Sequence, residues 1–123
     1  MSLHQVHETF AWVPILSNAA AGTWALAANW LEALRGKALW WFTGVAQITV
    51  FVQVLLGVIL LRTSGVALPR FHAFYGFVAL ISVAIIYSYR SQLRHRVYLL
   101  YGLGGLFVMG LGIRAMVLSH TTR

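Results

Sequence analysis

The sequence predicts an all-α polytopic membrane protein whose four transmembrane helices form an antiparallel bundle. Of the 123 residues, 60% are hydrophobic and 9% are charged, whereas soluble domains carry about 25% charged residues. Four apolar runs each approach the roughly 20 residues that a helix needs to cross a bilayer. The runs are too long for barrel strands and show no apolar–polar alternation. The length predicts one domain over residues 1–123.

The first predicted span covers residues 10–31 and is the least apolar of the four. A polar arm, Met1–Thr9, precedes it and is expected to lie outside the membrane. Asn18 lies within the span, and a polar side chain there favours contact with protein over contact with lipid. Small residues at i, i+4 and i+8 share one helix face on which another helix can pack closely. The residues of this face are Ser17, Ala21 and Ala25.

The remaining predicted spans cover residues 38–61, 71–89 and 97–118. Gln47 and Gln53 lie inside the second span, and we expect such amides to hydrogen-bond to a neighbouring helix. The fourth span has a face of glycines, which destabilise a helix unless close packing compensates. This face serves either the bundle itself or a helix of another protein. Its members are Gly102, Gly105 and Gly112.

The basic residues flank the apolar runs and give the chain a formal net charge of +7. This distribution is typical of membrane loops and not of a nucleic-acid-binding surface, so no nucleic-acid partner is expected. The connections after the first and third spans carry Arg35, Lys37, Arg90, Arg94 and Arg96, and the other side carries Arg62, Arg70 and Arg123. The larger number of basic residues in the connections after the first and third spans predicts a cytoplasmic position for those connections. It therefore predicts a multi-pass protein of the bacterial cytoplasmic membrane with both termini outside.

Arg114 lies four residues before the end of the fourth span, about 6 Å along the helix at 1.5 Å per residue. Its side chain either extends to the headgroups or forms an ion pair. The candidate partners are Glu8, an acidic lipid headgroup and an acidic residue of another subunit.

His72 is the histidine set inside an apolar run, and an ionisable residue near a helix end in a bilayer is a candidate functional residue. Tyr75 and Gly76 share its helical face. The small residue one turn below the imidazole leaves room for a flat ring such as haem or quinone, or for a neighbouring helix. Contact of His72 with water, lipid phosphate or a backbone carbonyl is the other interpretation.

Three further histidines, His4, His7 and His120, fall on the same predicted side of the membrane as His72. Imidazoles and the carboxylate of Glu8 gathered at one face could bind zinc or copper. The alternative is that they are solvated polar residues of mobile terminal segments.

The residues QVLLG in the second span and HAFYG at the start of the third resemble small bacterial cytochrome b561-like four-helix proteins. They also resemble the haem-bearing membrane anchors of succinate dehydrogenase, in which a His-x-x-x-Gly pattern occurs. This resemblance covers roughly residues 47–89, and the whole chain resembles small four-helix integral membrane proteins of bacteria. The resemblance implies haem b held by paired histidines. No second histidine falls within a predicted span, so the second haem ligand would be His120, a histidine of the N-terminal arm or a histidine of another subunit.

The sequence lacks a mid-membrane carboxylate, a serine–histidine–acid set and a phosphate-binding glycine loop, so catalysis is not expected. The leading hypothesis is a non-catalytic accessory, assembly or anchoring subunit of a larger bacterial membrane complex. It has no cofactor, and its partners are the lipid bilayer and other membrane subunits. The alternative is a redox-associated subunit that binds haem b or quinone near His72. The third hypothesis is a small homo-oligomeric transporter.

Overall fold

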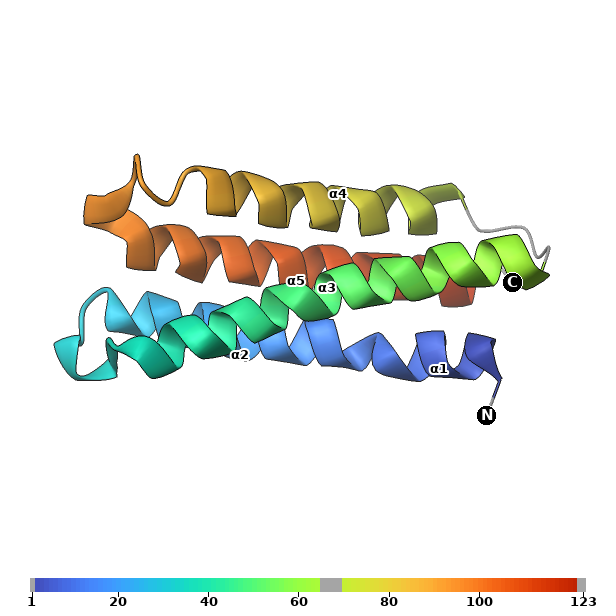
Figure 1. Ribbon diagram of the computed structural model, residues 1–123, viewed down its shortest axis with the longest axis horizontal. Coiled ribbons are helices and arrows are strands. Elements are labelled where there is room, and N and C mark those ends of the chain that lie inside the picture. The colour runs from blue at the N-terminus through green and yellow to red at the C-terminus, as the bar shows by residue number, and fades with distance from the viewer. Residues whose placement is uncertain (1, 65–69, 122–123) are drawn as a thin grey trace.

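The computed structural model describes residues 2–64 and 70–121, and all regular elements in these ranges are helical. A short helix comes first, and four long helices follow in an antiparallel bundle (Figure 1). They are α1 (Leu3–Phe10), α2 (Trp12–Ala28), α3 (Lys37–Ser64), α4 (Arg70–Ser88) and α5 (Val97–Thr121), with 3-10 turns η1 (Glu32–Leu34) and η2 (Arg94–Arg96). The predicted all-α bundle is confirmed.

Two helices in the described ranges are long and apolar enough to cross a membrane, Lys37–Thr63 and Arg94–Val117. The described part of α4 supplies a shorter apolar helix, His72–Ser88. The first predicted span corresponds mainly to α2, whose 17 residues are fewer than the roughly 20 that a bilayer crossing needs. Two candidate crossings are therefore found, and crossing by all four helices remains a prediction.

Pro14 explains why the first helix is divided. A proline ring clashes with the carbonyl of the residue four positions earlier, here Phe10, and has no N–H to donate to it. The first helix accordingly ends at Phe10, and the second begins at Trp12, which places Pro14 in the first turn of α2 where proline is tolerated. Ala11 between them keeps right-handed helical angles, with φ −53° and ψ −29°.

The predicted polar arm, Met1–Thr9, is helical over Leu3–Phe10, which forms α1. The Ser2 hydroxyl accepts a hydrogen bond from the Gln5 backbone N–H at 3.2 Å. In return, Gln5 Oε1 accepts one from the Ser2 N–H at 3.0 Å. This reciprocal capping box satisfies two N–H groups at the start of the helix. The helix carries His7 back towards the bundle instead of leaving it on a loose segment.

The closest contact in the bundle joins α2 to α5, the pair with the most extensive packing. A Cβ atom added at Gly105 would lie 2.9 Å from Gly22 Cα, and one at Gly102 would lie 2.8 Å from Leu26 Cα. At Gly112 the added atom would lie 2.9 Å from the Ile15 side chain. Glycine is therefore required for the two backbones to meet. The glycine face of α5 is occupied by α2 within the same chain.

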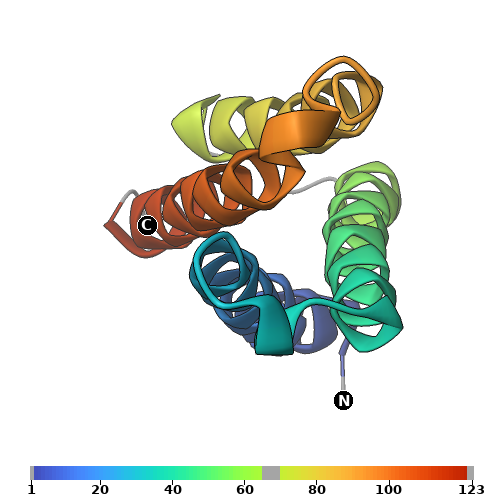
Figure 2. The ribbon, with the colours of Figure 1, turned by 90° about the vertical axis from the view of Figure 1, so that its left-hand side faces the viewer.

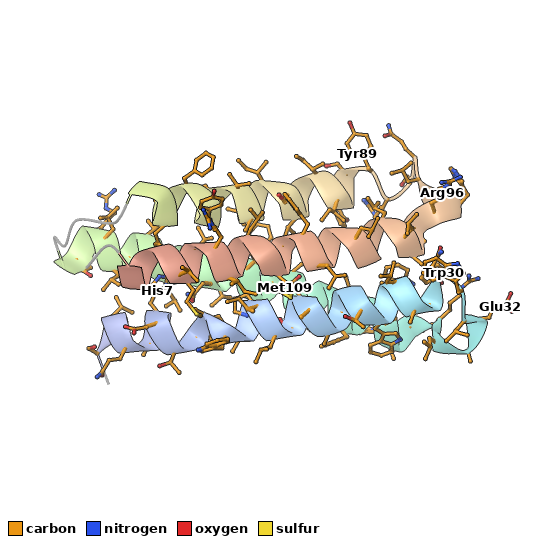
Figure 3. All side chains as sticks on the ribbon, turned by 180° about the vertical axis from the view of Figure 1, so that it is seen from behind. His7, Trp30, Glu32, Tyr89, Arg96 and Met109 are labelled. Atoms are coloured by element: carbon orange, nitrogen blue, oxygen red, sulfur yellow. The ribbon has the colours of Figure 1, made fainter. Side chains whose placement is uncertain are left out.

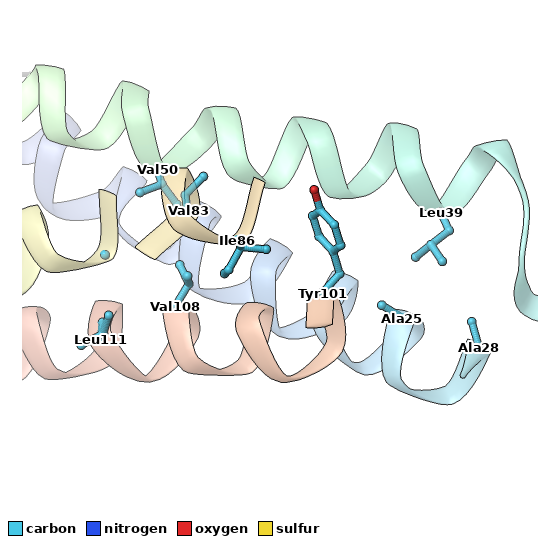
Figure 4. Close-up of a cluster of buried hydrophobic side chains, with 10 residues drawn as sticks. Ala25, Ala28, Leu39, Val50, Val83, Ile86, Tyr101, Val108 and Leu111 are labelled. Carbon is cyan, nitrogen blue, oxygen red and sulfur yellow. The ribbon is translucent and has the colours of Figure 1, made fainter. Parts of the chain in front are cut away.

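The other long helices pack on this pair, α4 against α5 and α3 against α2, while α3 and α4 contact each other less (Figure 2). Trp40 of α3 packs on Tyr101 of α5 with ring centroids 5.1 Å apart. A buried apolar cluster fills the space between the helices (Figure 4). Its members are Ala25, Ala28, Leu39, Val50, Ala79, Val83, Ile86, Tyr101, Val108 and Leu111.

The outer surface of the bundle is apolar. Leu16, Ile48 and Phe107 are 60%, 60% and 57% exposed, whereas the polar Asn18 is 3% exposed. Soluble proteins rarely expose large contiguous apolar surfaces. The described helices therefore show a distribution that suits contact with lipid on the outside and polar contacts within.

The close contact of α2 and α5 predicts different outcomes at two glycines of α5. Gly105→Ala should lower the free energy of unfolding by about 1–3 kcal/mol, because its methyl group would meet backbone atoms of α2. Gly110 has nothing within 4 Å of the added atom. Gly110→Ala should therefore leave stability unchanged or raise it by up to about 1 kcal/mol. Unfolding of both variants in detergent checks this, and equal losses would contradict the described contact.

Candidate histidine site

The structure brings together two histidines that lie 65 positions apart in the chain, His7 on α1 and His72 on α4. Their ring centroids are 6.0 Å apart, and the ring planes meet edge to face at 87°. Figure 3 places His7 at the end of the bundle opposite Arg96. No predicted span contains a second histidine, but the structure places His7 of α1 beside His72 of α4.

His72 is held in a defined orientation by α5. Its Nδ1 lies 2.8 Å from the carbonyl oxygen of Ala115. A carbonyl oxygen only accepts hydrogen bonds, so Nδ1 carries the hydrogen and donates it. In the neutral ring Nε2 then has the lone pair, which is the form that binds metals. The contact fixes both the tautomer and the direction of the imidazole.

His7 is positioned by α3 through its backbone and its ring. The side-chain nitrogen of Gln53 donates a hydrogen bond to the His7 carbonyl oxygen at 2.8 Å. A Cβ atom added at Gly57 would lie 3.1 Å from His7 Cε1, so glycine leaves room for the ring. Gln53 Oε1 is buried and accepts no hydrogen bond within the described residues. An unsatisfied acceptor of this kind costs free energy unless a ligand or water satisfies it.

The other residues predicted beside His72 are near it in the fold. Arg114, which precedes Ala115, lies over the ring of Tyr75 with its guanidinium carbon 5.8 Å from the centroid. This distance is at the outer limit of a cation–π contact. Gly76 faces open space, since an added Cβ atom would meet nothing within 4 Å. Within the described residues, no neighbouring helix therefore covers the position of Gly76.

The metal prediction concerned His4, His7 and His120. The side chains of His4 and His120 lie outside the described residues. In the part of the chain that the structure describes, no group of three or more histidine or acidic residues could hold a metal ion. Among the described residues the site therefore consists of two imidazoles.

The polar residues of α2 have structural contacts. Asn18 Nδ2 donates to the carbonyl of Pro14 at 2.8 Å and to that of Ala46, on α3, at 3.1 Å. The first of these bonds stays within α2, near its start, and the second links α2 to α3. Gln47 is half-buried on α3. The predicted small face of α2 is also inside the bundle: Ala21 and Ala25 are buried, and Ser17 Oγ lies 3.4 Å from Thr49 Oγ1.

The sequence left the histidine partner of His72 open and gave no role to Gly57. Gly57 ends the QVLLG motif, but its role depends on the His7 ring from α1. The proximity of His7 follows from the helical conformation of Leu3–Phe10. A signal for that helix exists, since Ser2 and Gln5 have the Ser-x-x-Gln spacing of a capping box.

Comparison with protein-family models, curated proteins and solved structures finds no match to this chain. The resemblance to haem-bearing membrane subunits therefore depends on the short motifs of residues 47–89 alone. The function has to be argued from the geometry of the site.

The bond between Gln53 and His7 predicts that α1 loosens when the amide is lost. Gln53→Met should increase amide hydrogen exchange over Leu3–Phe10, because nothing else replaces the 2.8 Å bond to the His7 carbonyl. Gln47→Met on the same helix is the matched control and should leave α1 unchanged. Hydrogen exchange followed by mass spectrometry in detergent measures both. Equal protection of α1 in the two variants would show that Gln53 does not tether it.

Proposed function

We propose that this chain is an integral protein of the bacterial cytoplasmic membrane whose four long helices all cross the bilayer. The two helices long and apolar enough to cross, α3 and α5, are separated in the chain by α4, which packs along α5 and also contacts α3. The exposed apolar side chains and the buried Asn18 support the same arrangement. In lipid, buried amides and small residues hold helices together.

The orientation follows from the arginines of the two connections at the end opposite the histidines. Arg35 is anchored there, since its Nε donates to the Ala28 carbonyl at 2.7 Å and its guanidinium lies 4.7 Å from the centre of the Tyr98 ring. Arg94 and Arg96 lie in η2 at the same end. The positive-inside rule places this end in the cytoplasm. The histidine site then lies near the outer face.

Within this frame, the function is that of a redox-associated subunit whose histidine pair binds b-type haem. The observation that carries the proposal is the pairing of His7 with His72, whose Nδ1–H is bound to the Ala115 carbonyl so that Nε2 is available. Haem supplies reversible one-electron transfer when two imidazoles ligate its iron. The protein contributes the two ligands, their orientation and an apolar surrounding.

The residues present fit such a group. Metal–imidazole bonds measure about 2 Å, so two rings whose centroids lie 6.0 Å apart are close enough to share one metal atom. Gly76, one turn from His72 on α4, has no neighbouring atom within 4 Å of an added Cβ atom and would leave room for a flat ring. Arg114 is exposed and lies near Tyr75, where its guanidinium would pair with the carboxylates of a haem. Quinone, the other ligand considered, needs only one imidazole and would not account for the proximity of His7 to His72.

The haem proposal predicts a reduced-minus-oxidised difference spectrum of a bis-histidine b-type haem for the purified protein. His7→Ala and His72→Ala should each abolish that spectrum, because one axial ligand is lost. His95→Ala is the control, since His95 lies in η2 at the opposite end and should retain it. A wild-type protein that stays colourless after reconstitution with haem would refute the proposal. So would a full spectrum from His72→Ala.

A single redox centre needs a donor and an acceptor, so the chain acts as a non-catalytic subunit of a larger membrane complex. The glycine face of α5 is not the docking surface, since α2 occupies it. The exposed apolar faces of α3 and α4, which contact each other little, are available to other membrane subunits. A transporter role has less support, because the buried polar residues of the described interior are Asn18 and Thr43, and neither ionises.

The subunit proposal predicts that tagged protein, extracted in mild detergent, co-purifies with other membrane proteins in constant stoichiometry. Their identification by mass spectrometry should include a redox protein. His72→Ala is the control for specificity, because it should lose haem and keep the partners. A monodisperse chain without partners in several detergents would refute the complex, and would leave the haem proposal to its own spectrum.

A further inference from the structure

An open apolar groove of about 570 Å³ runs between α4 and α5 on the outer surface of the bundle. Ile85 of α4 and Leu103 and Phe107 of α5 form its walls, and each is about half exposed. At its floor the Ile86 side chain packs against Gly104, where an added Cβ atom would lie 2.5 Å from it. Arg96 lines the groove at one end. The groove therefore has an apolar length and a cationic end.

The dimensions of the groove match one leaflet of a bilayer. Arg96 and Phe107 are eleven residues apart, a distance of about 16 Å at 1.5 Å per helical residue. The hydrocarbon core of a bilayer is about 30 Å thick, so the groove covers roughly half of it. A partner helix would cross both leaflets. A lipid acyl chain, by contrast, spans one leaflet. Its headgroup would then lie at the end of the groove that Arg96 lines.

The charge at the groove end specifies the headgroup. The connection between α4 and α5 contains Arg90, Arg94, His95 and Arg96 and no acidic residue. Arg90 is already engaged, since it donates to the Tyr87 carbonyl at 2.9 Å and lies 3.7 Å from the centre of the Tyr87 ring. Arg94 and Arg96 remain exposed. Basic pockets between transmembrane helices on the cytoplasmic side bind anionic lipid headgroups.

We propose that the α4–α5 groove binds one anionic phospholipid, with an acyl chain along Leu103 and Phe107 and the phosphate on Arg96. The inference depends on the proposed crossing of the membrane and is independent of haem. The bound lipid covers the groove and joins the ends of α4 and α5. It thereby supports the helix pair whose far end holds His72 against Ala115.

Native mass spectrometry of the full chain in detergent, titrated with phosphatidylglycerol or phosphatidylcholine, tests the proposal. One arginine near anionic lipid contributes about 1 kcal/mol, or roughly a fivefold preference for phosphatidylglycerol. Arg96→Gln should lose that preference, and Arg96→Lys should retain it. Arg62→Gln removes an exposed arginine at the other end of the bundle and should retain it as well. Equal binding of both lipids by the wild type overturns the proposal.

A photo-crosslinking amino acid in place of Leu103 identifies the occupant in membranes. Adducts with phospholipid are expected, and reaction with a second protein chain overturns the proposal. Carbonate extraction of the same membranes shows whether the chain is an integral membrane protein. It therefore distinguishes a groove that binds no lipid from a chain that does not cross the membrane. A chain that stays with the membranes and shows no preference for anionic lipid refutes the groove ligand alone.

Discussion

The backbone contact between α2 and α5 determines where the rest of the bundle lies. In the proposed lipid environment, which is as apolar as the helices themselves, close packing replaces the hydrophobic effect as the force that joins them. Gly22, Gly102 and Gly105 permit that packing. The first helix of the chain follows the line of α2, and α4 packs on α5. The separation of His7 and His72 therefore depends on how closely α2 and α5 approach, although neither histidine lies on those two helices.

Proline and glycine have complementary effects at the histidine end of the fold. Pro14 divides the first helix and leaves its own carbonyl beside Asn18, which donates to that oxygen and to Ala46 of α3. The same amide thus links α2 to α3 one turn after Pro14. Gly57 then admits the ring of His7, which the divided helix brings against α3. A histidine on a continuous straight helix would have met the bundle in a different place.

The sequence was sufficient to predict the helices and the packing faces, and insufficient to predict the histidine pair. Apolar runs and their glycines report directly on local conformation, so the bounds of α3, α4 and α5 fall within about three residues of those predicted. The pair depends on α1, whose polar composition resembled an unstructured arm although Ser2 and Gln5 provide its cap. Gly22 escaped notice because it lies in a run of alanines, and only α5 shows which face it occupies.

The two candidate sites lie at opposite ends of α5, and their spacing bears on the membrane proposal. Ala115 holds His72 at one end, and Arg96 heads the groove at the other. The two residues are nineteen positions apart, about 28 Å along a helix, close to the roughly 30 Å of a hydrocarbon core. Between them the helix carries apolar and aromatic side chains and glycine as far as Arg114. The spacing of these two contacts therefore agrees with the proposed crossing of a bilayer by α5. The proposed lipid and the proposed haem would then bind at opposite ends of the helix and use different residues.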